Sequence, residues 1–192
     1  MTGRVVLRMG HPVLMQVAEP VTETGTERLH QLVADMWDTM AEYGGIGLAA
    51  PQIGVSERLV VFGVQDQEER APEVAIAPTV LINPVITALD DSLEHGWEGC
   101  LSVPGMRGLV PRHARIRYTG IDENGNIIDR EVEGYHARVV QHECDHLDGV
   151  LYPQRMDDLT QFGFEPEMTE RLLGALAQEA SADNTCKTPG EN

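Results

Sequence analysis

Residues 141–149 read QHECDHLDG, and His142, Glu143 and His146 within them form the pattern HExxH. Residues four apart on an α-helix lie about 40° apart around its axis, one turn along it, so both imidazoles can face one metal ion. Glu143, about 100° round from His142, can then reach a water held by that ion and accept its proton. Two solvated histidines on an amphipathic helix would give the same pattern, so the surrounding sequence must supply the rest of the site.

A catalytic site of this kind needs a third protein ligand, with the fourth position left to water. In the longer protease pattern HExxHxxGxxH the third ligand is a later histidine, but that position here holds Tyr152. A thermolysin-like arrangement would use a downstream glutamate, and Glu165 or Glu167 could serve. The alternative lies upstream, where Cys100 sits in EGCLSVPG (residues 98–105), in a segment expected to form a strand.

The other two cysteines are poor candidates for a ligand. Cys144 lies about 200° round the helix from His142 and so faces away from the metal, which suits a small core residue. Cys186 belongs to a polar tail. Cys100 is therefore the thiolate ligand if one exists. Three widely spaced cysteines do not form a disulfide framework, which favours a reducing compartment.

Size and charge exclude several classes of protein. The 192 residues suit a single domain that buries about 70% of its unfolded surface. The formal net charge of −17 repels polyphosphate backbones, so DNA is not expected as a partner. The N-terminus lacks the long apolar run of a signal peptide, and no stretch reaches the length of a membrane span. We therefore expect a cytoplasmic protein without a membrane partner.

Helical periodicity predicts three helices. The first starts after Thr24 or Thr26, ends at Gly44 or Gly45, and buries one apolar face made of Leu29, Leu32, Val33, Met36 and Met40. The second carries HExxH and runs from about Tyr135 to Leu147. The third is expected over residues 167–180 and is weakened by Gly174. Residues 1–180 then form one catalytic domain, and residues 181–192 form a disordered polar tail.

Several short strands lie between the first two helices. Residues 58–64 (RLVVFGV) and 79–87 (TVLINPVIT) are apolar, and the second run is expected to break at Pro84. A surface loop is expected over residues 66–78. RIRYTGI and IIDREVE flank DENGN, whose Asn124-Gly125 pair predicts a hairpin turn. Strands in succession, with the helices set apart from them, indicate the α+β class.

The glycine-rich stretch GGIGLAAPQIG (residues 44–54) superficially resembles a phosphate-binding loop. A dinucleotide fingerprint follows a strand and opens a helix, whereas this stretch follows a helix. Pro51 also stands where a phosphate-binding helix should be running. The remaining alternatives are a tight turn before the next strand and a backbone that approaches another chain closely.

Three stretches together resemble the signature motifs of the peptide deformylases: GIGLAAPQIG (residues 45–54), EGCLS (98–102) and QHECDHLDG (141–149). They occur in the order of that family and with its kind of spacing, and the resemblance covers roughly residues 5–160. It implies a peptide-deformylase-like α+β fold with antiparallel strands around a central HExxH helix, and with an N-terminal and a C-terminal helix.

The resemblance also implies a metal site and a reaction. Cys100, His142 and His146 would hold the metal, usually Fe²⁺, with Zn²⁺, Ni²⁺ or Co²⁺ possible at the same ligands. The enzyme would hydrolyse the formyl amide of N-formyl-methionine at the start of nascent chains and release formate. Glu143 would act as the general base. The Gln52 side-chain amide and the Leu101 backbone N–H would stabilise the oxyanion.

Substrate and partner assignments follow from the same resemblance. The Gly47 backbone would orient the peptide, Arg107 could steer it, and the walls of the methionine pocket would be Ile46, Tyr135 and Val139. Arg138 places a charge near that pocket, and Glu98 is expected to brace the ligands by hydrogen bonds. Residues 153–192 carry three basic residues against eight acids, so any ribosome contact would be weak. A monomer is expected. The alternatives are a zinc endopeptidase that uses Glu165 or Glu167, and a catalytically silent metal- or peptide-binding module.

Overall fold

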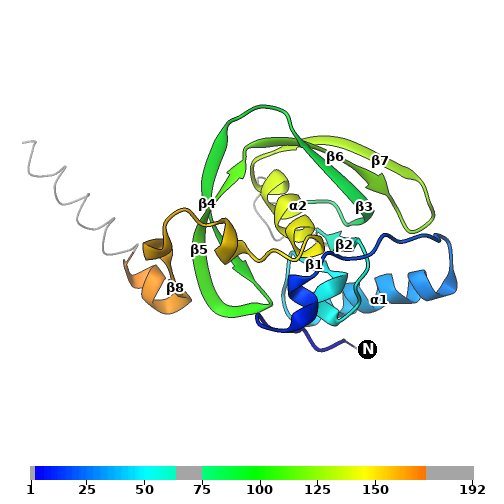
Figure 1. The fold of residues 1–192 in the computed structure, drawn as a ribbon, viewed down its shortest axis with the longest axis horizontal. Coiled ribbons are helices and arrows are strands. Elements are labelled where there is room, and N and C mark those ends of the chain that lie inside the picture. The colour runs from blue at the N-terminus through cyan, green and yellow to red at the C-terminus, as the bar shows by residue number, and fades with distance from the viewer. Residues whose placement is uncertain (1–2, 64–74, 172–192) are drawn as a thin grey trace, which may run out of the picture.

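The computed structural model describes residues 3–63 and 75–171, which contain two long helices and two antiparallel sheets (Figure 1). The helices are α1 (Glu27–Glu42) and α2 (Gly134–Leu147). The five-stranded sheet has the spatial order β1 (Gly47–Ala49), β2 (Leu59–Phe62), β3 (Thr79–Ala88), β6 (Arg115–Ile121) and β7 (Ile127–Glu133). The three-stranded sheet has the order β4 (Leu93–Cys100), β5 (Val103–His113) and β8 (Phe162–Phe164). The expected α+β class is confirmed.

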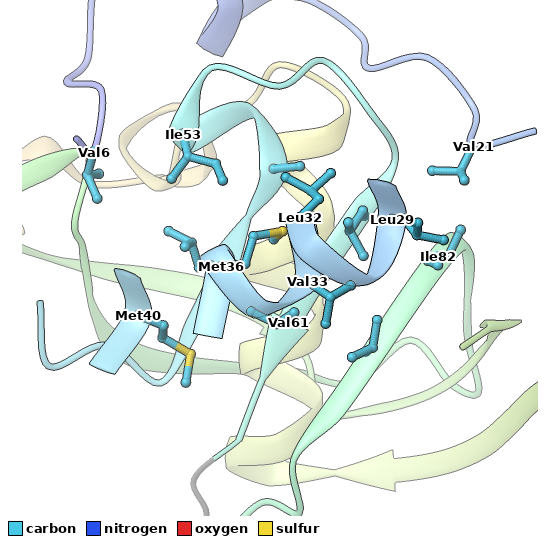
Figure 2. Close-up of a cluster of buried hydrophobic side chains, with 14 residues drawn as sticks. Val6, Val21, Leu29, Leu32, Val33, Met36, Met40, Ile53, Val61 and Ile82 are labelled. Carbon is cyan, nitrogen blue, oxygen red and sulfur yellow. The ribbon is translucent and has the colours of Figure 1, made fainter. Parts of the chain in front are cut away.

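Helix α1 forms where the apolar periodicity predicts it. Its N-cap is Thr26, whose Oγ1 accepts a hydrogen bond from the Leu29 N–H at 3.2 Å. Gly44 follows the helix in the left-handed conformation, with φ at 68°, which suits a helix end. The buried apolar positions are those predicted: Leu29, Leu32, Val33, Met36 and Met40 (Figure 2).

The five-stranded sheet is covered by α1 on one face and by α2 on the other. Successive side chains of a strand point to opposite faces. Leu59 and Val61 of β2 accordingly join the core cluster that contains α1 (Figure 2), whereas Val60 and Phe62 join the cluster that contains α2. Because both faces of β2 are buried, its sequence is apolar throughout. Figure 1 shows α2 at the centre of the molecule, where it also contacts β5 of the smaller sheet.

Gly149, just after the end of α2, occupies a position that no other residue type fits. Gly149 has φ at 71°, and a Cβ built there would lie 2.7 Å from the carbonyl carbon of Met15. The N-terminal segment passes directly over this point, and the Ala18 N–H donates to the Leu147 carbonyl at 2.8 Å. The chain before α1 is thereby held against the helix that carries HExxH.

The expected break at Pro84 is wrong, because β3 continues through it. The register of β3 against β6 shifts between Ile82 and Val85, and Asn83 adopts φ of 50° within this irregularity. The irregularity places the proline, which has no N–H to donate, outside the regular ladder. The Asn83 side chain forms hydrogen bonds to another segment of the chain: it accepts from the Val21 N–H at 2.9 Å and donates to the Val21 carbonyl at 2.8 Å.

The predicted hairpin is present, since β6 pairs with β7 across Asn124-Gly125. The strand expected around Cys100 is also present as β4, and Cys100 is its last residue. The pattern did not predict that β4 forms a long hairpin with β5. The third helix begins at residue 165, two residues earlier than expected. Its part beyond residue 171, the tail 181–192 and most of the expected loop 66–78 lie outside the described residues. In the described ranges, no helix combines the length and apolar character required to span a membrane.

Candidate metal centre

Two elements bring one cysteine and two histidines together. Cys100 is the last residue of β4, and His142 and His146 lie one turn apart on α2. Their candidate ligand atoms all lie within 4.8 Å of one another, and Cys100 Sγ is 3.4 Å from His146 Nε2. Within residues 3–63 and 75–171, these three are the side chains grouped closely enough to be a possible metal site. The smaller sheet thus contributes one candidate ligand and the central helix contributes two.

The donor set fits a transition metal. One thiolate and two imidazoles are ligands that Zn²⁺ and Fe²⁺ accept in proteins. Burial alone would raise the pKa of the Cys100 thiol, but His146 and His142 beside it hold that pKa well below its usual value. The metal-binding thiolate form is therefore favoured.

The sulfur is oriented by its neighbours. The Ser102 N–H donates to Cys100 Sγ at 3.4 Å, and Gln52 Nε2 lies 3.5 Å from the same sulfur. Gln52 is itself fixed: its Oε1 accepts from the Ala49 N–H at 2.8 Å, and its Nε2 donates to Ser102 Oγ at 3.1 Å. The turn that follows β1 therefore aims the Gln52 amide group at the candidate ligands.

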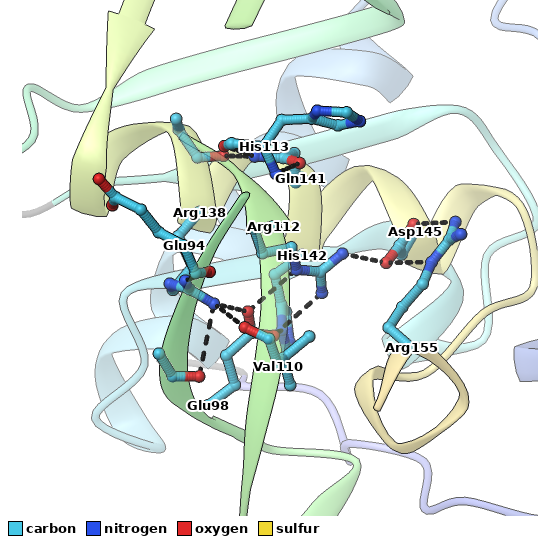
Figure 3. Close-up of polar contacts among 12 residues, drawn as sticks. Glu94, Glu98, Val110, Arg112, His113, Arg138, Gln141, His142, Asp145 and Arg155 are labelled. Carbon is cyan, nitrogen blue, oxygen red and sulfur yellow. Dashed lines mark hydrogen bonds and ion pairs between the residues drawn. The ribbon is translucent and has the colours of Figure 1, made fainter. Parts of the chain in front are cut away.

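His142 is oriented by a buried carboxylate (Figure 3). Its Nδ1 lies 2.8 Å from Glu98 Oε2, and Arg112 donates two hydrogen bonds to the same carboxylate at 2.9 and 3.0 Å. Burial would raise the pKa of Glu98, but the hydrogen bonds from His142 and Arg112 lower it to about 2. An ionised Glu98 can accept the Nδ1 proton of His142, which makes Nε2 the nitrogen that would bind a metal.

The same arginine links this carboxylate to Asp145, three residues after His142 on α2. Arg112 Nη1 donates to Asp145, whose other oxygen accepts from Arg155 at 2.7 Å (Figure 3). Arg112, Glu98 and Asp145 are all buried, with exposed fractions of 5%, 5% and 7%. Since each charge is paired, the burial of this network does not leave an uncompensated ion in the core.

Glu143 lies beside the ligands with one oxygen available. Its Oε2 is buried and receives no hydrogen bond from the described residues. Burial raises the pKa of its carboxyl, and the nearby histidines lower it again, which leaves it at about 7. A pKa near neutrality suits a group that must accept and release a proton.

Gly47 makes room for this carboxylate. A Cβ built on Gly47 would lie 2.6 Å from Glu143 Cδ and 2.7 Å from its Cγ. One glycine of the glycine-rich stretch is therefore required by the close approach of Glu143. Residues 47–49 form the short strand β1, so the stretch is more than a tight turn.

A cavity of about 970 Å³ opens in front of the ligands. Cys100, His142 and Glu143 line it, whereas His146 lies behind them with 1% of its surface exposed. The cavity is also lined by the other residues to which the resemblance gives a role in catalysis or substrate binding, namely Ile46, Gly47, Gln52, Leu101, Arg107, Tyr135 and Val139.

Other residues that line the cavity were missed in the sequence. Residues 5–8 form part of its wall, because the Leu7 N–H donates to the Gln52 carbonyl at 2.8 Å and the Met9 N–H to the Ser102 carbonyl at 2.8 Å. Nothing in the periodicity of this segment indicates such a contact. Trp97 lies directly before the motif around Cys100, so its place in β4 is the only signal that could have suggested it.

Neither alternative glutamate joins the candidate ligands. Glu165 lines the cavity, but its Oε1 accepts a hydrogen bond from Arg107 Nη2 at 3.0 Å. Glu167 is exposed. Tyr152, at the position where the longer protease pattern has its third histidine, packs its ring against His142 at 24° with centroids 6.1 Å apart. The geometry therefore favours the cysteine ligand over the thermolysin-like arrangement.

Comparisons with known proteins point to one family. The family model described as polypeptide deformylase matches residues 4–162. Peptide deformylase 1 of Nitrosomonas europaea is 59% identical over 83% of this chain and 90% of its own length. Peptide deformylase 2 of Ralstonia nicotianae is 57% identical over 84% and 91%. The Met-Ala-Ser-bound crystal structure of a class I type b peptide deformylase from Acinetobacter baumannii is similar, with a TM-score of 0.75 and 34% identity over 81% of this chain and 99% of that chain.

Proposed function

Because the chain belongs to the polypeptide deformylase family, we propose that it removes the N-formyl group from the N-terminal methionine of newly synthesised proteins and releases formate. The observation that carries this proposal is the placement of the Glu143 carboxylate in one cavity with Cys100 and His142, with His146 grouped directly behind them. The related Acinetobacter enzyme was crystallised with Met-Ala-Ser bound, which supports the proposal that the cavity of this chain accepts a peptide that begins with methionine.

Cys100, His142 and His146 would hold the metal, for which we propose Fe²⁺, with Zn²⁺, Ni²⁺ or Co²⁺ possible at the same ligands. A metal at these ligands would act as a Lewis acid and make water a better nucleophile at neutral pH. Glu98 keeps the His142 ring in the orientation and tautomer that a metal needs.

Glu143 supplies the proton transfers. Its Oε2, which has no hydrogen-bond partner in the described part of the chain, can accept a proton from the attacking water and then give it to the nitrogen of the departing amine. The pKa of about 7 balances these two tasks, because the group is then neither a very weak base nor a very weak acid. Gly47 keeps the space around the carboxylate open, so the side chain can remain where the water must be.

Gln52 and Leu101 would stabilise the oxyanion that forms when the formyl carbon is attacked. The Gln52 amide group points at the ligands, and Leu101 lines the cavity next to Cys100 in the chain. One such donor is typically worth about 3 kcal/mol in the transition state. Ile46, Tyr135 and Val139 would enclose the methionine side chain, while the Gly47 backbone and Arg107 would align the peptide.

The remaining expectations belong to the same proposal. Residues 1–180 would act as one catalytic domain in the cytoplasm, on nascent chains, as a monomer. Residues 153–192 carry three basic residues against eight acids, so ribosome contact would be weak. DNA and membranes would not be partners.

The test is formate release from a formyl-Met-Ala-Ser peptide by protein loaded anaerobically with Fe²⁺. We expect Glu143→Gln to lower kcat by at least about 100-fold, since it removes the base but keeps the shape of the side chain. Cys144→Ala is a matched control, because Cys144 is the buried neighbour of Glu143 on the face of α2 that packs in the core. Equal rates for wild type and Glu143→Gln would refute the assignment of the base.

Metal content provides an independent measurement. Cys100→Ala should lose bound metal, whereas a thermolysin-like site would keep it. If Cys100→Ala binds Fe²⁺ as tightly as the wild type, the proposed ligand set is wrong even where the peptide is deformylated.

A further inference from the structure

Arg138 is an almost buried arginine that reaches from α2 to β4 (Figure 3), and it is one of the residues that line the cavity. Its side chain is 11% exposed. Nη1 donates to Glu98 Oε1 and to the Val110 carbonyl, both at 2.8 Å, and Nη2 donates to the Glu94 carbonyl at 2.6 Å. One guanidinium thus joins α2 to both strands of the β4–β5 hairpin.

Gly96 lets the guanidinium lie flat against β4. A Cβ built on Gly96 would be 2.6 Å from Arg138 Cζ and 2.7 Å from its Nε. Any larger residue would push the arginine away from the strand. The contact between these two elements therefore depends on a residue pair, a glycine on the strand and an arginine on the helix.

The position of this contact matters because the two elements it joins carry the candidate ligands. Cys100 ends β4, and His142 lies one turn after Arg138 on α2. Arg138 also completes the support of Glu98. Oε1 of that carboxylate accepts from Arg138 and Arg112, and Oε2 accepts from Arg112 and lies 2.8 Å from His142 Nδ1.

We propose that Arg138 is a positioning residue for the metal site, which acts through Glu98 on His142. With Oε1 held from two sides, the carboxylate cannot rotate, and Oε2 stays on the Nδ1 proton of His142. Without Arg138, Arg112 still binds Glu98 through two hydrogen bonds. Loss of Arg138 should therefore weaken metal binding without abolishing it. The inference rests on the proposed function for its meaning, but its test measures metal binding without any peptide.

The probe is Co²⁺, titrated into metal-free protein at fixed pH and followed by its visible absorption. Arg138→Met should weaken Co²⁺ binding by about 10-fold, the lower end of the range for residues that orient metal ligands. Arg138→Lys keeps a charge that can reach Glu98 and should recover most of the affinity. Arg117→Met removes an exposed arginine that pairs with Asp129 on the outer strands β6 and β7, and should bind Co²⁺ like the wild type.

A double-mutant cycle distinguishes positioning from simple stabilisation. If Arg138 acts through Glu98, Arg138→Met should change Co²⁺ affinity by less than about 2-fold in a Glu98→Gln background. Thermal unfolding of each variant separates loss of affinity from loss of fold. The proposal is overturned if Arg138→Met melts earlier but binds Co²⁺ with unchanged affinity and absorption, or if its effect is the same in both backgrounds. Neither outcome depends on whether the protein deformylates a peptide.

Discussion

At the scale of single residues, the candidate site depends on glycines that leave space for their neighbours as much as on reactive side chains. Gly47 lies where a methyl group would collide with Glu143, and Gly96 lies where one would displace Arg138. Both glycines have ordinary backbone angles, so their role is close approach and not a special conformation. The sequence motifs contain such glycines, but the neighbour that each one admits becomes visible only in the fold.

Gly47→Ala should lower kcat by about 100-fold while the protein remains folded, because a displacement of about 1 Å in a catalytic group has an effect of this size. The added methyl would lie 2.6 Å from Glu143 Cδ and would push the carboxylate from its place. Gly163→Ala is the control, since its methyl meets the thioether of Met168, which can move. Formate release and circular dichroism would be measured for both variants. Full activity in Gly47→Ala would mean that Glu143 tolerates displacement.

Sequence alone identified most of the candidate site. Spacing makes His142 and His146 a ligand pair and leaves Cys100 as the candidate thiolate, and the resemblance implies that all three hold one ion. The fold places their ligand atoms within 4.8 Å of one another. Arg138 lies at the cavity, as its place one turn before His142 indicates, but residues 5–8 and Trp97 show the limit of this approach. They reach the cavity through contacts between segments far apart in the chain, and no local pattern records such contacts.

At the scale of elements, helices were predicted better than strands. The apolar period of α1 and the HExxH helix α2 agree with the structure to within a residue or two. The strand β5 contains Pro104, Gly105, Gly108 and Pro111, residues that normally argue against a strand. It forms because β4 and β8 pair on its two sides, a tertiary effect that overrides local preference.

The N-cap of α1 offers a direct test at this scale. Thr26→Ala should lower the free energy of unfolding by about 1 kcal/mol, because the Leu29 N–H loses its acceptor. Thr24→Ala removes the other threonine that the sequence allowed as a cap and should have a smaller effect. Urea unfolding of both variants would measure the difference. Equal losses would show that the hydrogen bond of Thr26 does not stabilise the helix.

At the scale of the whole molecule, the N-terminal segment is bound to α1 by charge. Arg4 donates to Asp35 Oδ2 through Nε at 2.9 Å and Nη2 at 2.7 Å, and Gln31 donates to Oδ1 at 2.9 Å. These hydrogen bonds, first from Gln31 and then from Arg4, lower the pKa of Asp35 below its usual value. The segment that starts here continues into the cavity wall, so its attachment affects the site as well as stability.

Asp35→Asn should lower the free energy of unfolding by about 1 kcal/mol at pH 7, a modest value because Arg4 is 41% exposed. A carboxyl whose pKa is lowered by folding stabilises the protein above its unfolded pKa, about 3.9, and this contribution is lost as the pH falls through the folded pKa. The difference between wild type and variant should therefore be complete at pH 6–7 and shrink below about pH 4.

The measurement is urea unfolding of both proteins from pH 7 to pH 3, with a chelator present so that metal release does not contribute. A difference that stays constant across this range would show that the charge of Asp35 is not what stabilises the contact.

The candidate ligands come from a strand and a helix that are far apart in the chain, and this has a mechanical consequence. An ion held by Cys100 on the β4–β5 hairpin and by two histidines on α2 would link the hairpin to the helix, in addition to the side-chain contacts between them. By mass action, an ion at 100 times its dissociation constant would add about 2.7 kcal/mol to the folded state. Chelation should therefore speed amide hydrogen exchange first in α2 and the β4–β5 hairpin, while the amides of α1 and of the strands that it covers stay protected.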